Sequence, residues 1–213
     1  ALPAGDARQE PRTWLAVSGF MLVLNGSQMI RVNLDSILLG LLLSPADVGI
    51  YTAALRTATL VSFVFMISSV VAQPAISSLH ARQSQRELSR FVASTTRGVF
   101  VASLLVGLGL AATGRLILSL FGAEFVAAYP ALLILIAGHV LAAAFGPRTS
   151  VLMMTGRHRA AAVIHAVSLP VQALLSAFLI GSLGVRGAAL AAATGLLLTQ
   201  FVLYVIASRN AGP

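Results

Sequence analysis

The sequence contains no cysteine and no lysine. Without cysteine there is no disulfide framework, no thiolate metal site and no cysteine nucleophile. Without lysine, all 14 basic residues are arginines. A guanidinium does not lose its proton at physiological pH, so any arginine in apolar surroundings needs a partner, water or a bound anion.

Charge of either sign is scarce. Charged residues make up 9% of the 213 residues and hydrophobic residues 58%, which excludes an ordinary soluble domain. The net charge of +8 would suit nucleic acid, but the basic residues flank apolar runs. Membrane topology and anionic lipid headgroups explain that placement, so we expect membrane lipids as partners and no nucleic acid.

Long uncharged stretches dominate the chain. Several exceed the roughly 20 residues that cross a hydrocarbon core of ~30 Å. The sequence therefore predicts an all-α membrane protein, a bundle of six transmembrane helices over about 14–43, 48–79, 91–112, 127–154, 160–183 and 185–208.

Both ends of the chain are predicted to lie outside the helices. Residues 1–13 read as a cytoplasmic linker and 209–213 as a cytoplasmic tail. The chain opens without an initiator Met or a signal-peptide pattern, so we expect it to be a piece of a longer protein.

The distribution of arginines predicts the orientation. Nine fall on one side of the predicted spans and two, Arg115 and Arg186, on the other. Because cytoplasmic loops carry the excess of positive charge, we predict an inner-membrane protein with both termini of this segment cytoplasmic. The nine are Arg8, Arg12, Arg82, Arg86, Arg90, Arg97, Arg157, Arg159 and Arg209.

Polar side chains follow one face of the first predicted helix. Asn25, Gln28, Arg31 and Asp35 fall within roughly a third of its circumference. Ionised groups at membrane depth are costly, so this stripe should face protein or a wet cavity. Arg31 and Asp35 are four residues apart, and a structural ion pair that fixes helix packing is the alternative interpretation.

The second predicted helix carries a matching stripe. Two consecutive helices with one polar face each favour a shared hydrated interior. Arg56 and Arg148 are further candidates for residues that line this interior. For these two arginines the alternative is that the long side chains reach the headgroups. The stripe comprises Thr52, Arg56, Thr59, Ser62, Ser69 and Gln73.

Signatures of catalysis and metal binding are lacking. His139 and His165 lie in predicted spans without a carboxylate at ligand spacing, so we expect no metal site. No Ser/His/Asp arrangement, acid pair or phosphate-cradling Gly loop is recognisable, so we expect no cofactor and no enzyme.

Gly187, Ala191 and Gly195 form a ridge of small residues that permits close helix packing.

Six stretches rich in spaced Gly, Pro and small residues resemble a known family. They are Asn33–Gly40, Ser44–Arg56, Gln73–Ser77, Leu120–Phe125, Thr155–Arg157 and Gly184–Ala189. Together, over roughly 14–208, they resemble the C-terminal half of a polysaccharide-biosynthesis flippase of the multidrug/oligosaccharidyl-lipid/polysaccharide exporter superfamily. The resemblance implies one lobe of a two-lobe transporter, with an N-terminal six-helix lobe supplied by the rest of the same protein.

The resemblance also implies a function. The complete protein would flip a lipid-linked oligosaccharide across the cytoplasmic membrane by alternating access. Arg31, Arg56 and Arg148, with Asn25 and Gln28, would line a cationic cavity that holds the pyrophosphate. A guanidinium suits that role because it binds phosphate oxygens in bidentate fashion.

Two alternatives remain open at this point. A cation-coupled multidrug antiporter of the same superfamily would use Asp35 as its ion site, although Arg31 one turn away favours a carboxylate that stays charged and occupied. A non-transporting membrane scaffold would use the same charges only to fix helix packing.

Overall fold

The computed structural model describes residues 11–209, and within that range the chain consists of helices and short connecting turns, without strands. The elements are α1 (Pro11–Leu42), α2 (Pro45–Ala81), α3 (Gln85–Ser119), the 3-10 turn η1 (Ala123–Ala128), α4 (Tyr129–Ala143), α5 (Arg148–Met154) and α6 (His158–Arg209). Most of the predicted linker and tail, residues 1–10 and 210–213, lies outside the described residues.

The prediction of an all-α, multi-pass membrane protein is confirmed. In the described part, four helical stretches are long and apolar enough to cross a membrane: Pro45–Ala81, Arg86–Ser119, Ala123–Ala143 and His158–Ala207. α1, which holds the polar stripe, is not among them. Six separate crossings and a two-lobe arrangement stay predictions.

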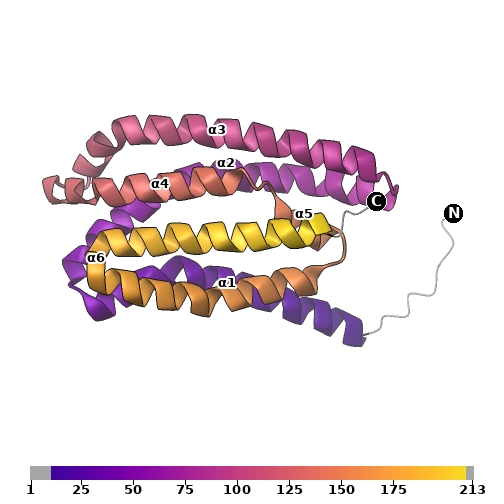
Figure 1. The fold of residues 1–213 in the computed structure, drawn as a ribbon, viewed down its shortest axis with the longest axis horizontal. Helices are drawn as coiled ribbons and strands as arrows, with labels where there is room; N and C mark the ends of the chain where they lie inside the picture. Colours follow the sequence, from indigo (N-terminus) through magenta and orange to yellow (C-terminus); the bar gives the residue numbers. More distant parts are fainter. Residues whose placement is uncertain (1–10, 210–213) are drawn as a thin grey trace.

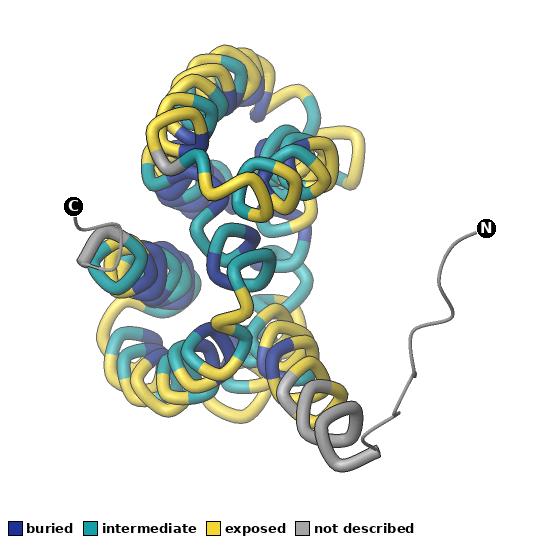
Figure 2. The backbone as a smooth tube through the Cα atoms, turned by 90° about the vertical axis from the view of Figure 1, so that its right-hand side faces the viewer, coloured by how far each residue is buried: buried dark blue, intermediate teal, exposed yellow. Residues whose placement is uncertain are grey.

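The helices lie nearly parallel, as Figure 1 shows. α1 packs mainly against α6, α2 mainly against α3, and α4 lies between α3 and α6. Viewed along the helices, buried positions face neighbouring helices and exposed ones face outward (Figure 2). Many of the outward side chains are large and apolar, including Leu22, Leu41, Val71, Leu174 and Phe178, as a lipid-facing surface requires.

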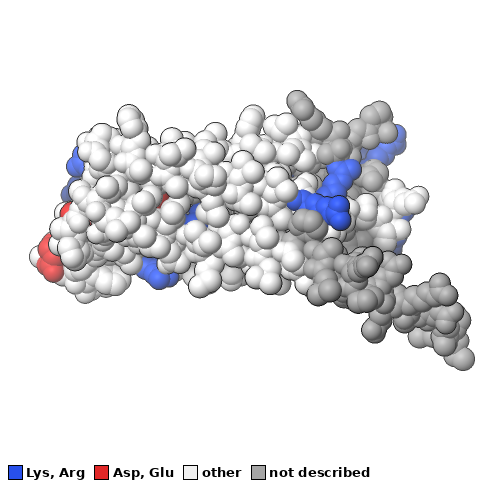
Figure 3. Space-filling view, turned by 90° about the horizontal axis from the view of Figure 1, so that it is seen from below, with Lys and Arg blue, Asp and Glu red and all other residues white. Residues whose placement is uncertain are grey.

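Charged side chains gather mostly toward the two ends of the bundle on the face shown in Figure 3. At one end, the turn between α1 and α2 is built by a capping box. Ser44 accepts a hydrogen bond from the Asp47 amide, and the Asp47 carboxylate accepts one from the Ser44 amide. This box and Pro45 in the first turn explain why α2 begins where it does.

α6 is two helices joined at one residue. Gly184 has φ 57° and ψ −133°, and the chain reverses there so that residues 158–183 (the first arm) and 185–209 (the second arm) lie side by side (Figure 1). Such backbone angles are accessible to glycine and costly for other residues. The predicted boundary between the fifth and sixth helices falls at this position.

The structure differs from the prediction of one helix over 127–154. The chain forms η1 and α4, breaks after Ala143, and resumes as α5 at Arg148. Gly146 has φ 71° in the break, and a Cβ there would lie 2.0 Å from Thr96 Oγ1. Pro147 follows, which lacks an amide donor, so a continuous helix is not compatible with this segment. α3 also runs to Ser119, beyond the predicted end at 112.

The reversal of α6 brings the two arms into backbone contact at Gly187. A Cβ on Gly187 would lie 1.9 Å from the Leu179 carbonyl oxygen, whereas a Cβ on Gly181 would meet nothing within 4 Å. The small-residue ridge therefore does serve close packing, beside the turn.

We expect Gly187→Ala to destabilise the protein by at least about 1–3 kcal/mol, because the backbone of the first arm must move to relieve the clash. Gly181→Ala is the matched control on the same element and should leave stability unchanged or raise it by up to about 1 kcal/mol, since alanine favours helix over glycine. Thermal unfolding of the purified protein in detergent measures both, and equal unfolding temperatures would contradict this account of the hairpin.

Candidate functional site

A cavity of about 880 Å³ lies between the helices, lined by α1, α2, α4, α5 and both arms of α6. It is partly open to the outside, since the lining residues Asn25, Gln28 and Met66 are exposed. Its volume falls within the ~300–1,000 Å³ typical of ligand sites. Apolar walls are interrupted by many polar side chains, which include Asn25, Gln28, Arg31, Asp35, Thr59, Ser62, Ser69, Gln73, His139, Thr149, His165, Gln172, Thr199 and Gln200.

Asp35 is the most deeply buried charged group described, with 3% of its surface exposed. Its Oδ1 accepts a hydrogen bond of 2.5 Å from Ser176, and its Oδ2 accepts bonds from Gln172 Nε2 at 3.0 Å and Tyr51 Oη at 3.3 Å. A buried carboxylate is tolerable only when its oxygens are satisfied in this way. The acid of α1 thus holds together α1, α2 and the first arm of α6.

Arg31 connects α1 to both arms of α6. Its Nη1 donates to Thr199 Oγ1 at 3.0 Å, and its Nη2 donates to Ser168 Oγ. The two hydroxyls in turn donate to backbone carbonyls of their own helices, at Gly195 and His165. Nε of Arg31 is buried and has no hydrogen-bond partner within the protein.

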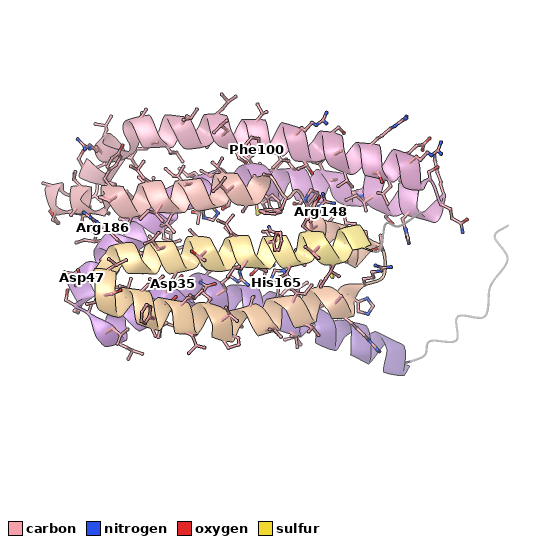
Figure 4. The ribbon with its side chains drawn as sticks, viewed as in Figure 1. Asp35, Asp47, Phe100, Arg148, His165 and Arg186 are labelled. Atoms are coloured by element: carbon pink, nitrogen blue, oxygen red, sulfur yellow. The ribbon has the colours of Figure 1, made fainter. Side chains whose placement is uncertain are left out.

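Within residues 11–209, no ion pair joins Arg31 to Asp35, although they are one turn apart. The alternative of a direct structural ion pair therefore does not describe this geometry. Each group is instead bonded to α6, the acid to the first arm and the guanidinium to both (Figure 4 shows Asp35 between α1 and α6).

The structure brings four of the six predicted site residues to the cavity and leaves two outside its lining. Asn25, Gln28, Arg31 and Asp35 line it. Arg56 is exposed on α2, about a quarter turn of the helix away from the cavity-lining face. Arg148 is half-buried at the start of α5.

The surroundings of Arg148 explain its position. Nε of Arg148 donates to the Phe145 carbonyl oxygen at 2.7 Å, and the guanidinium carbon lies 4.8 Å from the centre of the Tyr204 ring. The side chain therefore closes the break after α4 and stacks on the second arm of α6. Of the three arginines, only Arg31 lies in the lining of this cavity. A role for all three in substrate binding stays a prediction.

Sequence reasoning missed the contribution of α6. Ser168, Gln172 and Ser176 recur every four residues, so they share one helical face, and all three bond to Arg31 or Asp35. The signal was the same periodicity that identified the stripe on α1.

Both span histidines also line the cavity. His139 Nδ1 is 3.0 Å from Ser62 Oγ, linking α4 to α2, and His165 Nε2 is 3.4 Å from Thr149 Oγ1. In the described part of the chain, no three His, Asp or Glu side chains come together in a way that could hold a metal ion.

The amino-terminal part of the chain matches a known family. Residues 7–130 match the family described as polysaccharide biosynthesis protein, a stretch that includes α1, α2, α3 and η1. Among curated proteins and solved structures, nothing matches the chain.

We expect Asp35→Asn to lower stability by about 1.5–3 kcal/mol or more, because three donors would then face a neutral amide that offers a single acceptor oxygen. Asp47→Asn is the matched control at the end of the bundle, where the capping role costs at most about 1 kcal/mol to perturb. Thermal unfolding in detergent compares the two variants. A smaller loss at Asp35 than at Asp47 would show that the buried network does not hold the helices together.

Proposed function

This chain belongs to the polysaccharide biosynthesis protein family, and from that premise we propose that the complete protein flips a lipid-linked oligosaccharide, a precursor of a surface polysaccharide, across the cytoplasmic membrane. The chain would form one lobe, with a second six-helix lobe closing the transport path and alternating access moving the substrate. We propose transport without covalent chemistry. The orientation predicted from the arginines would place both ends of this segment on the cytoplasmic side.

The observation that carries the proposal is the polar cavity between long apolar helices. A bundle needed only for anchoring has no use for some 880 Å³ of space lined with amides, hydroxyls, a guanidinium and a carboxylate. A substrate whose head is polar and whose tail is lipid needs such a path, since the head cannot cross the hydrocarbon unassisted.

Arg31 is the residue proposed to hold the pyrophosphate. Its present partners are two neutral hydroxyls, Ser168 and Thr199. Hydrogen bonds to an anionic phosphate oxygen are roughly twice as strong as neutral ones, so a pyrophosphate can compete for the same N–H groups. The unpaired Nε supplies a further donor.

The other two arginines receive different roles in this proposal. Arg56 is exposed on α2 next to the cavity-lining residues Leu55 and Thr59, so it would contribute only where the second lobe completes the path. Arg148 is committed to the Phe145 carbonyl and the Tyr204 ring, and its part in substrate binding is the weaker one.

The antiporter alternative has less support from the geometry. An ion-coupling carboxylate must exchange its cation, but the Asp35 oxygens already accept three hydrogen bonds. Drug efflux that depends on Asp35 would favour that alternative. The scaffold alternative is supported by the same bonds. Replacing Arg31 and Asp35 together by Leu and Met tests it, because preserved polysaccharide export in this variant would mean that the two charges serve packing alone.

We expect Arg31→Gln in the complete protein to reduce polysaccharide export more than tenfold, because the cavity loses the one guanidinium among its described lining residues. Arg31→Lys should give an intermediate loss, since lysine keeps the charge and lacks the planar fork. The measurement is surface polysaccharide per cell, with membrane levels of the protein determined by immunoblot.

Arg115→Gln is the control, because this exposed arginine stacks on Tyr129 far from the cavity lining. It should export normally. Normal export in an Arg31→Ala/Arg56→Ala double variant that inserts normally would overturn the proposed role of the arginines.

A further inference from the structure

Buried polar atoms without a partner are concentrated around the cavity. In the described part of the chain, seven buried side-chain nitrogen or oxygen atoms have no hydrogen-bond partner within the protein, and five of them belong to cavity-lining residues. Such atoms are few in folded proteins, and a cluster of them needs an explanation. The five are Arg31 Nε, Ser69 Oγ, His165 Nδ1, Gln172 Oε1 and Gln200 Oε1.

The charge of the lining restricts what can satisfy these atoms. Among the described residues that line the cavity, Arg31 and Asp35 are the only ones of the Arg, Asp and Glu types, and their charges cancel. The remaining polar groups are amides, hydroxyls and imidazoles. A lining of this kind suits a mainly uncharged ligand with many hydroxyl groups, each able to donate and to accept.

Two glutamines on the two arms of α6 provide the best-placed amides. Gln172 and Gln200 are 2% and 9% exposed. Nε2 of Gln172 must face Asp35, because a carboxylate only accepts, and this leaves its Oε1 as the unpaired acceptor. The terminal dihedral of glutamine is broad, so the Gln200 amide can turn to a ligand without moving its helix.

Glycine makes room for this arrangement. A Cβ on Gly195 would lie 3.0 Å from Gln172 Oε1 and 3.2 Å from its Cδ, so a larger residue on the second arm would crowd the Gln172 amide. Ser69 supplies an unpaired hydroxyl from α2 to the lining of the same cavity. Leu24, Phe65 and Leu196 give the apolar surface on which the C–H face of a sugar ring can pack.

We propose that the part of the cavity lined by Gln172, Gln200 and Ser69 is a sugar subsite that binds an uncharged, hydroxyl-rich glycan, while Arg31 alone contacts the pyrophosphate. This rests on the proposed function and divides its substrate between two sets of residues. In the ligand-free state, water molecules would hydrogen-bond to the unpaired polar atoms. When the glycan binds, its hydroxyl groups would replace these water molecules, so each polar atom would keep a hydrogen-bond partner.

The test compares three probes on the complete purified protein by calorimetric titration: farnesyl diphosphate, farnesyl diphosphate carrying an uncharged disaccharide, and free maltotriose. We expect Gln200→Met to weaken binding of the glycosylated probe and of maltotriose by about 2–10-fold, the effect of losing one or two hydrogen bonds. Binding of bare farnesyl diphosphate should not change. Arg31→Gln should weaken both diphosphates.

A matched pair of serines serves as the control. Ser69 and Ser103 both carry a buried, unpaired hydroxyl, but only Ser69 lines the cavity. Ser69→Ala should weaken the sugar-bearing probes, and Ser103→Ala should change none. Because Gln200 Oε1 has no partner to lose, Gln200→Met should retain or raise the unfolding temperature, which a structural role would not allow.

The outcomes separate this inference from the proposed function. If Gln200→Met weakens all three probes equally, or none, the sugar subsite is overturned. If wild-type protein binds neither diphosphate but binds maltotriose in a Gln200-dependent way, the flippase proposal fails and the sugar subsite stands.

Discussion

The cost of a carboxylate in an apolar interior organises this protein. Asp35 accepts hydrogen bonds from α2 and from the first arm of α6, and these bonds connect elements far apart in sequence. A buried carboxylate that loses a donor is costly, so the three donors and the acid constrain one another strongly. The position of α1, and with it the wall of the cavity, follows from this one group.

The sequence predicted part of the fold and part of the site, for identifiable reasons. Apolar length predicted helices and the polar stripe on α1 predicted an interior, because both depend on spacing along one helix. The break at Gly146 and Pro147 departs from the predicted continuous helix although a Gly-Pro pair is itself a helix-breaking signal. Only the close approach of Thr96 to Gly146 is a tertiary contact that the sequence does not show. Arg56 lies outside the cavity lining because it stands at the edge of the polar stripe on α2. Arg148 lies outside it because its guanidinium is bonded to the Phe145 carbonyl and stacked on Tyr204.

The partners of Arg31 and Asp35 could not be predicted, because spacing along one helix does not show which residues of another helix it contacts. Periodicity places Ser168, Gln172 and Ser176 on one face, but only the packing of α1 on α6 decides which face of another helix they meet. Arg31 and Asp35, expected to pair with each other within α1, each form hydrogen bonds to α6 instead. The Arg31 guanidinium thus joins α1 to both arms of α6, and it is also the group proposed to bind an anion.

The reversal at Gly184 has a mechanical consequence. Ser168 lies sixteen residues before Gly184 and Thr199 fifteen after it, so at 1.5 Å per residue Arg31 clasps the two arms about 23 Å from the turn. The two arms are therefore linked twice, by the turn at Gly184 and by the hydrogen bonds of Arg31 farther along the helices. In the proposed function, an anion that took over the Arg31 guanidinium would remove this second link between the arms and leave the contacts nearer Gly184 in place.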